Sequence, residues 1–362
     1  MKRIRLTLAK SSYDIIIGQG IINRLAPLVK KLSLGQDSVI ITNPLIRRKL
    51  GRSIESALLK GGLSVKFFEV SDTEKSKSIA TLTRLINRIA KYDVKKKTFI
   101  IAFGGGVIGD LAGFVAAIYK RGVPYIQIPT TLLAQIDSSI GGKTGIDLTL
   151  GKNLIGAFNQ PRLVLSDVQY LKYLPAPQLR SGLAEAIKYG VIKDPTLFRF
   201  LEKNHKYIVG KNLRMLEILV SACSKIKAGI VERDEREEKG LRTILNFGHT
   251  VGHALEAASG YRGLSHGEAV ALGMIAASRI SHRLGMLNSI NLKRIESLIR
   301  KAGLPAKIRD VKFKEVMSAF QHDKKFISGK NRLVLPLSIG KVTIVEDVPL
   351  AVIDETVAGL IG

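Results

Sequence analysis

The first 130 residues alternate short strand-like runs with segments of helical periodicity. Runs rich in β-branched and aromatic residues occur at 38–43 (SVIITN), 64–70 (SVKFFEV), 98–103 (TFIIAF) and 125–130 (YIQIPT). The segment 76–92 (SKSIATLTRLINRIAKY) between two of them repeats apolar residues at helical spacing. Strands that alternate with helices predict a parallel sheet with helices packed on its faces.

The pattern changes near residues 171–178 (LKYLPAPQ), where two prolines favour a hinge. Beyond this point the periodicity is overwhelmingly helical. A chain of 362 residues is also long enough for two hydrophobic cores. We therefore predict an α/β domain over residues 1–176 and a mainly α-helical domain over residues 177–362.

The net charge of +27 raises the question of a nucleic-acid partner. The Lys and Arg residues are spread along the chain, aromatic residues make up 6%, and no recognition motif is visible. We therefore predict a generally basic surface that suits small anionic substrates, and no nucleic-acid partner.

The cysteine content and the N-terminal sequence bear on location. The single cysteine, Cys223, excludes an internal disulfide and is typical of a reducing compartment, and we expect a buried, inert thiol there. The first 20 residues alternate apolar and polar side chains, unlike a secretory signal, and no transmembrane segment is evident. A cytoplasmic protein with no membrane partner is expected.

A glycine-rich turn follows the strand-like run at 98–103. Gly104, Gly105, Gly106 and Gly109 satisfy the pattern G-x-G-x-x-G and open a helical segment. Glycines allow the backbone to approach a phosphate, and the N-terminus of a helix offers free N–H groups. A structural tight turn explains the pattern equally well when it is taken alone.

Two further polar loops support the phosphate-binding interpretation. Asp110 lies on the glycine turn, a second glycine pair leads into Lys143, and the segment 151–158 (GKNLIGAF) offers Lys152 and Asn153. We expect three loops that follow consecutive strands to meet at the carboxyl edge of the sheet, where nucleotides bind.

Three histidines within eighteen residues indicate a metal site. His249 and His253 are spaced i, i+4 on a predicted helix, and His266 follows, each next to a glycine. A lone histidine is usually an ordinary core or surface residue, but three in glycine-rich surroundings favour a divalent metal. A carboxylate would complete a catalytic site. The candidates are Glu185, Glu256 and Glu268, among which the pattern does not choose.

A series of motifs runs along nearly the whole chain, in the order FGGGVIGDLAGFVAA, RGV, QIPTTLLAQIDSSIGGKTGID, GKNLIGAFNQP, SGLAEAIKYG, LNFGHTVGHALE, HGEAVALGM and HDKK. Together and in this order, these motifs resemble the 3-dehydroquinate synthase family.

The resemblance implies a cytoplasmic, homodimeric enzyme of the shikimate pathway. Such an enzyme is a lyase that converts 3-deoxy-D-arabino-heptulosonate 7-phosphate into 3-dehydroquinate and phosphate. Its reaction comprises transient oxidation by NAD, elimination of phosphate, re-reduction and intramolecular aldol cyclisation. The resemblance also implies a Rossmann-like N-terminal domain that binds NAD, and a helical C-terminal domain that binds substrate and zinc or cobalt.

The resemblance implies a set of site residues. The metal ligands fall on Glu185, His249 and His266, which replaces the pair His249 and His253. His253 would instead contact the substrate or relay a proton. The implied catalytic residues are Asp137, Lys143, Lys188 and His253. The implied substrate contacts are Arg121 from the partner subunit, Asn153, Lys227, Arg242, Asn246 and Lys325, with the role of the adjacent Lys324 unassigned. The implied NAD contacts are Asn43, Asp72, Glu74, Lys77, Gly105, Gly106, Val107, Ile108, Gly109, Asp110, Thr130, Thr131, Lys143 and Lys152.

Two residues depart from the family pattern. Thr73 stands where glycine is usual, and Tyr173 stands where threonine is common beside the nicotinamide, so local cofactor contacts are in question at both. Two enzymatic alternatives stay open: another sugar-phosphate cyclase, and a metal-dependent polyol dehydrogenase with net release of NADH. Arg242 and Asn246 favour the substrate that bears a carboxylate.

Overall fold

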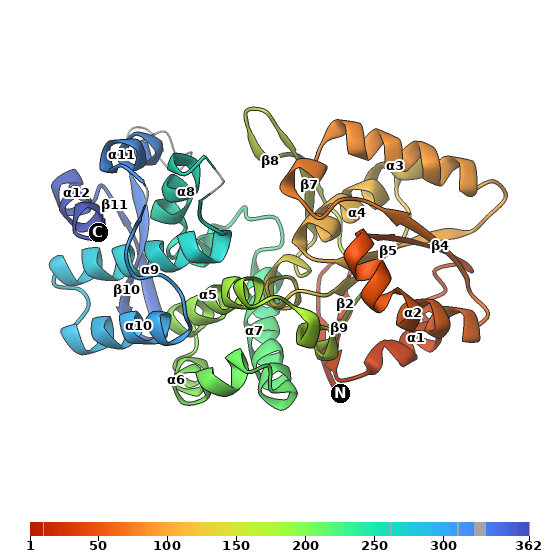
Figure 1. The fold of residues 1–362 in the computed structure, drawn as a ribbon, viewed down its shortest axis with the longest axis horizontal. Helices are drawn as coiled ribbons and strands as arrows, with labels where there is room; N and C mark the ends of the chain where they lie inside the picture. The colour runs from red at the N-terminus through yellow and green to blue at the C-terminus, as the bar shows by residue number, and fades with distance from the viewer. Residues whose placement is uncertain (10, 261–262, 310, 322–330, 362) are drawn as a thin grey trace. The chain divides into compact units, whose positions relative to one another are not determined.

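The computed structural model describes residues 1–9, 11–260, 263–309, 311–321 and 331–361 (Figure 1). The chain forms two compact units. The first comprises residues 1–174 and 216–236, and the second comprises residues 175–215 and 237–362. A functional boundary after residue 176 remains a prediction.

The first unit contains a seven-stranded sheet in the order β1-β2-β9-β6-β5-β3-β4. Its strands are β1 (Lys2–Leu6), β2 (Tyr13–Gly18), β3 (Asp37–Thr42), β4 (Ser64–Glu69), β5 (Thr98–Gly104), β6 (Tyr125–Pro129) and β9 (Leu163–Asp167). All neighbouring strands run parallel except β1, which is antiparallel to β2. The predicted parallel sheet is confirmed, and the four predicted strands agree with β3 to β6 to within one residue at each end.

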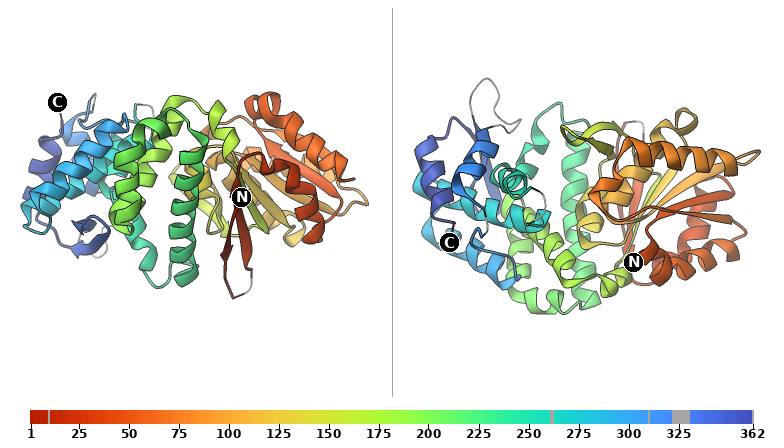
Figure 2. Two further views of the ribbon diagram at one scale, coloured as in Figure 1. Left: turned by 90° about the horizontal axis from the view of Figure 1, so that it is seen from below. Right: turned by 45° about the horizontal axis from the view of Figure 1, so that its top comes forward.

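Helices cover both faces of this sheet because successive strand residues point to opposite sides. Ile40 packs in a core with residues of α1 (Leu25–Lys31) and α2 (Pro44–Lys60). Its neighbours Val39 and Ile41 pack in a second core with α3 (Ile79–Tyr92) and α4 (Gly106–Ile118). Figure 2 shows these helices on the two sides of the strands.

The segment 151–158 corrects one prediction. It is not a loop after a parallel strand but strand β8 (Gly151–Phe158), which pairs antiparallel with β7 (Lys143–Leu148) in a separate two-stranded sheet. Only two residues connect these strands, and so short a connection favours a hairpin. Lys143, Lys152 and Asn153 therefore belong to this hairpin.

The second unit is mainly helical, as predicted. Its helices are α5 (Ala176–Ile192), α6 (Pro195–Val209), α8 (His249–Ala258), α9 (His266–Arg283), α10 (Ser289–Lys301), α11 (Phe313–Gln321) and α12 (Leu350–Ala358). It also contains a hairpin of β10 (Arg332–Ser338) and β11 (Lys341–Glu346), which the sequence interpretation missed. The remaining long helix, α7 (Leu213–Arg233), contributes most of its length to the first unit. None of the helices within the described ranges is both long and apolar enough to cross a bilayer.

Glycines bring α5, α8 and α9 into backbone contact. A Cβ atom on Gly273 of α9 would lie 1.9 Å from the carbonyl oxygen of Gly248, the residue before α8. A Cβ atom on Gly267 would lie 2.3 Å from the Cα atom of Ser181 in α5. Neither site has room for a side chain. This close packing brings the first residues of α8 and α9 to the middle of α5.

Candidate metal and nucleotide sites

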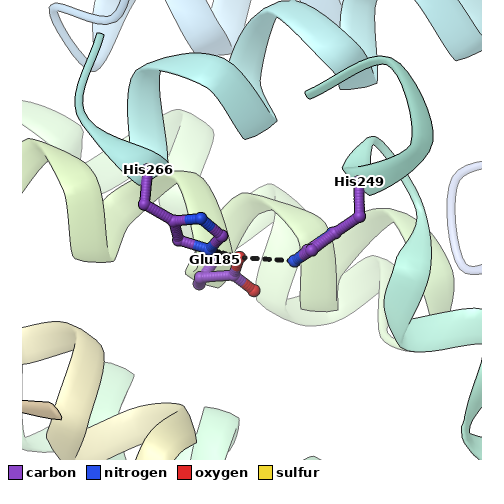
Figure 3. A group of neighbouring side chains, drawn as sticks. All are labelled: Glu185, His249 and His266. Carbon is purple, nitrogen blue, oxygen red and sulfur yellow. Dashed lines mark ion pairs between the residues drawn. The ribbon is translucent and has the colours of Figure 1, made fainter. Parts of the chain in front are cut away.

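Three side chains of the second unit form a cluster that could bind a metal (Figure 3). Glu185 projects from α5, His249 is the first residue of α8, and His266 is the first residue of α9. One ligand atom from each lies within 4.8 Å of the others. The Nε2 atoms of His249 and His266 lie 3.5 Å and 3.6 Å from Oε1 of Glu185.

The local backbone directs His249 toward this cluster. Gly248, immediately before it, has a φ of +81°, a left-handed conformation that glycine adopts without strain. Nδ1 of His249 lies 3.2 Å from the carbonyl oxygen of Phe247. A carbonyl only accepts hydrogen bonds, so Nδ1–H donates to it and Nε2 faces Glu185.

The surroundings shift the pKa values of the two imidazoles in opposite directions. Burial, reinforced by the ammonium of Lys188, holds the pKa of His249 well below its usual value. For His266, burial lowers the pKa, but hydrogen bonds to Glu185 and Glu256 outweigh it and raise the pKa to about 9. The two imidazoles therefore lie in different electrostatic surroundings, although both face Glu185.

The three candidate carboxylates have different partners in the structure. Glu268 accepts a hydrogen bond from the backbone N–H of Ser265 at 2.9 Å and caps its own helix. Glu256 lies 3.5 Å from Nδ1 of His266, the nitrogen opposite to the one that faces Glu185. Among the described residues, only Glu185 groups with both imidazoles.

His253 lies beside the cluster, and its ring centroid is 5.4 Å from that of His249. It is not a member of the group of three within the described part of the chain. The role that the resemblance implies for His253, contact with the substrate or relay of a proton, stays a prediction.

Two basic residues of the second unit, Lys188 and Arg242, are buried. Lys188 lies one helical turn after Glu185, forms an ion pair with it, and is 2% exposed. Arg242 is also buried, and its Nε atom lies 3.1 Å from Oε1 of Glu237. Asn246 ends the short 3₁₀ helix η6 (Leu241–Asn246), three residues before His249, and is half-buried.

In the first unit, the glycine turn forms a phosphate-type cradle. Helix α4 begins at Gly106, and its N-cap, Gly105, offers no side chain to the free N–H groups. Val107, Ile108 and Gly109 complete the first turn of α4. A Cβ atom on Gly105 would lie 3.1 Å from the methyl group of Thr131. A side chain at residue 105 would therefore reduce the space beside the start of the helix. N–H groups without a partner inside the helix suit a phosphate at a helix N-terminus.

Several of the predicted NAD residues follow neighbouring strands, at the carboxyl ends of the parallel strands of the sheet. Thr130, after β6, donates its N–H to the carbonyl of Gly104 at the end of β5, at 2.9 Å. Asn43, after β3, caps α2 through Ile46 and donates to Asp72, after β4, at 2.9 Å. Because parallel strands end together, their carboxyl ends bring these residues to a common edge.

Lys77 connects this edge to the β7–β8 hairpin. Its ammonium is 3% exposed and lies 3.0 Å from Asp110, 3.4 Å from Glu74 and 3.7 Å from Asp147. It also donates to the side chain of Asn153. Burial raises the pKa of Asp110 to about 6, although Lys77 opposes the shift. Asp147 was missed from the sequence, where its only signal is its place at the end of KTGID.

The other predicted residues have varied surroundings. Asp137 lies on a π-helical turn, η4 (Ala134–Ser138), and accepts a hydrogen bond from Lys227 of α7 at 2.5 Å. Lys143, Lys152 and Arg121 are exposed. Lys324 and Lys325 lie outside the described residues.

The structure gives the conformation or exposure of the two residues that depart from the family pattern, Thr73 and Tyr173. Thr73 has a φ of −132°, an extended conformation that does not require glycine. Tyr173 ends η5 (Val168–Tyr173) and is 57% exposed.

Comparison with known proteins places the chain in a family. The family described as 3-dehydroquinate synthase N-terminal matches residues 67–181, and the one described as 3-dehydroquinate synthase C-terminal matches residues 182–326. The chain belongs to the 3-dehydroquinate synthase family. The 3-dehydroquinate synthase of Desulforamulus reducens is 44% identical over 96% of this chain and 97% of its own length. The 3-dehydroquinate synthase of Pelotomaculum thermopropionicum is 45% identical over 95% of this chain and 93% of its own length.

Solved structures of sugar-phosphate cyclases share the fold of this 3-dehydroquinate synthase family member. A crystal structure of 2-deoxy-scyllo-inosose synthase with carbaglucose-6-phosphate, NAD⁺ and Co²⁺ has a TM-score of 0.91 at 25% identity, covering 99% of this chain and 100% of the other. The 2-epi-5-epi-valiolone synthase of Streptomyces hygroscopicus, with NAD⁺ and Zn²⁺ bound, has a TM-score of 0.88 at 27% identity, covering 98% of both chains. Glycerol dehydrogenase from Schizosaccharomyces pombe, at 18% identity and a TM-score of 0.68 over 96% of this chain and 88% of its own, shares the fold alone.

Proposed function

We propose that this protein converts 3-deoxy-D-arabino-heptulosonate 7-phosphate into 3-dehydroquinate and phosphate, as a phosphate-eliminating lyase with bound NAD and zinc or cobalt. The activity is that of the family to which the chain belongs. The observation that carries its chemistry is the cluster of Glu185, His249 and His266.

The donor atoms of this cluster fit a catalytic divalent metal. Two imidazole nitrogens and one carboxylate oxygen are the usual ligands of zinc, and three protein ligands leave a position open for substrate. The glycine cradle at α4 fits the phosphates of a dinucleotide, because its N–H groups have no side-chain cap. The relatives solved with NAD⁺ and Zn²⁺ or Co²⁺ support both assignments.

The bound groups would supply Lewis-acid stabilisation of a substrate alkoxide and a hydride acceptor that is regenerated within each cycle. The chain's own residues would bind and orient the substrate and move protons. Arg242 suits bidentate binding of the substrate carboxylate, and Lys143 and Lys188 act as point cations. His253 relays a proton at its imidazole. Asp137 and Lys227 act as a pair whose hydrogen bond orients both side chains.

The nucleotide and substrate assignments extend to the other predicted residues. Asn43, Asp72, Glu74, Lys77, Gly105, Gly106, Asp110, Thr130, Thr131 and Lys152 would contact NAD. Asn153 and Asn246 would contact the substrate. Arg121 would reach the substrate phosphate of the partner subunit, so the proposed working unit is a homodimer. We also propose that the enzyme is cytoplasmic.

A direct assay tests the proposed function. Purified protein is supplied with NAD, zinc or cobalt, and the heptulosonate phosphate, and both phosphate and 3-dehydroquinate are measured. Equal amounts of the two products are expected, without accumulation of NADH absorbance. Net NADH formation would instead indicate a polyol dehydrogenase. Turnover of sedoheptulose 7-phosphate or glucose 6-phosphate in place of the acid would indicate another cyclase.

A further inference from the structure

The imidazole of His266 has a carboxylate on each side. Its Nε2 atom lies 3.6 Å from Oε1 of Glu185, and its Nδ1 atom lies 3.5 Å from Oε2 of Glu256. A neutral imidazole binds a metal through the nitrogen that carries no proton. The group that faces the other nitrogen therefore decides which one is available to the metal.

His249 has the same arrangement, but a backbone group takes the place of the carboxylate. Its Nδ1 atom lies 3.2 Å from the carbonyl oxygen of Phe247, while its Nε2 atom faces Glu185. The Phe247 carbonyl is part of the main chain, so no side-chain substitution removes it. Glu256 is the corresponding group for His266, and it can be replaced.

The position of Glu256 on α8 explains how it reaches His266. His249, His253 and Glu256 are spaced i, i+4 and i+7, which places them on one face of the helix. Glu256 is 6% exposed, and a buried carboxylate needs a hydrogen-bonded or charged partner. The contact with His266 supplies such a partner and joins α8 to the first residue of α9.

We propose that Glu256 is a positioning residue of the metal site: it accepts the Nδ1–H of His266 and thereby directs Nε2 toward the metal. The proposal rests on the proposed function, since it assumes that Glu185, His249 and His266 bind the metal. Glu256 is not proposed as a ligand. It faces Nδ1 of His266, and among the described residues it does not belong to the group of Glu185, His249 and His266.

Metal affinity measured on the metal-stripped, full-length protein tests the proposal. Zinc is titrated in competition with a chromophoric chelator for the wild type, Glu256→Ala and Glu256→Gln. Loss of such an orienting group weakens metal binding by about 10–100-fold, and we expect this for Glu256→Ala. Glu256→Gln keeps an acceptor oxygen without the charge, so a smaller loss is expected.

Glu268→Gln is the matched control. Glu268 is also a carboxylate near the start of α9, but it bonds to Ser265 of its own helix cap. Its replacement is expected to leave zinc affinity within about threefold, well below the effect of losing an orienting group. An equal loss of zinc affinity in Glu256→Gln and Glu268→Gln would mean that any change of charge near α9 weakens the site. This result would overturn the proposal.

The absorption spectrum of bound cobalt separates positioning from ligation. If Glu256 positions His266, the Co²⁺-loaded variants keep the band shape and intensity of the wild type, and only their affinity is lower. A changed coordination spectrum would make Glu256 a ligand, which also contradicts the proposal. Circular dichroism of the metal-stripped proteins checks folding, and Glu256→Gln carries the test if Glu256→Ala does not fold.

The outcomes distinguish this proposal from the proposed function. If the wild type itself binds no zinc or cobalt, the proposed metal site is wrong. If the wild type binds zinc and both Glu256 variants bind it equally well, only the role of Glu256 is wrong.

Discussion

At the scale of single residues, the metal cluster depends on side chains that are far apart in sequence. Glu185 is fully buried, and it faces two imidazoles and the ammonium of Lys188. Three histidines were enough to predict a metal site from the sequence. The choice among Glu185, Glu256 and Glu268 needed the resemblance or the structure, because the spacing along the chain says nothing about which helix faces which.

His249→Ala tests the metal site directly. Removal of one of three protein ligands is expected to reduce turnover by about a thousandfold or more and to weaken zinc binding strongly. NAD binding is expected to persist, because the proposed NAD residues belong to the other unit. Steady-state assays, zinc titration and NAD titration provide the measurements. His205→Ala, a half-buried histidine of α6, serves as the control and should keep full activity; full activity of His249→Ala would refute the ligand assignment.

Asp110→Asn is expected to change how stability depends on pH. The pKa of Asp110 is raised to about 6, mainly by burial, whereas an aspartate in an unfolded chain titrates near its ordinary value of 3.8. Between these values the folded protein retains a proton that the unfolded chain has lost. Ionisation of Asp110 therefore lowers wild-type stability as the pH rises through this window, and the asparagine variant escapes this loss.

The measurement is denaturant unfolding of both proteins from about pH 4 to pH 7. The free energy of unfolding of Asp110→Asn, minus that of the wild type, should rise by about 1–3 kcal/mol across this window. The sign is the decisive part, because a carboxylate stabilised by Lys77 would give the opposite trend. A difference that stays constant or falls with pH would contradict the environment described for Asp110.

At the scale of elements, the proposed metal ligands are positioned by close helix packing. The glycines beside the histidines allow this close approach of backbone segments, as the contacts at Gly248 and Gly267 show. Local periodicity predicted β3 to β6 well, since a strand flanked by helices has a clear pattern. It missed β8 and the β10–β11 hairpin, because short alternating segments in glycine-rich or helical surroundings resemble loops.

Gly273→Ala tests this packing. The added methyl group would overlap the Gly248 carbonyl, so α8 and α9 must separate. We expect a loss of about 1–3 kcal/mol in the free energy of unfolding, together with weaker zinc binding, because His249 follows Gly248 directly. Chemical denaturation and zinc titration measure the two effects.

Gly229→Ala is the matched control for this substitution. Gly229 lies inside α7, and its added Cβ would meet no atom within 4 Å. The replacement should therefore stabilise the protein by about 0.5–1 kcal/mol, as alanine is the better helix former. If Gly273→Ala were as stable as Gly229→Ala, the backbone contact between α8 and α9 would be looser than described.

At the scale of the whole molecule, the net charge of +27 suits the anionic substrate that we propose. A substrate with a carboxylate and a phosphate is attracted by such a field, and this attraction is screened by salt. The value of kcat/KM is therefore expected to fall by about tenfold or more between low and high ionic strength, while kcat changes little. Initial rates in a KCl series measure this. A kcat/KM that does not depend on salt would mean that the basic surface plays no part in substrate capture.

The sequence alone determined the properties that depend on local pattern. The alternation of strands and helices, the glycine turn before a helix and the clustering of histidines are set by residues near one another in the chain. Tertiary structure decided the rest. It brought Glu185 rather than Glu268 to the imidazoles, joined residues 216–236 to the first unit, and surrounded Lys77 with three carboxylates. These outcomes depend on how distant helices and strands pack, and packing is decided by the burial of side chains against partners that no local pattern specifies.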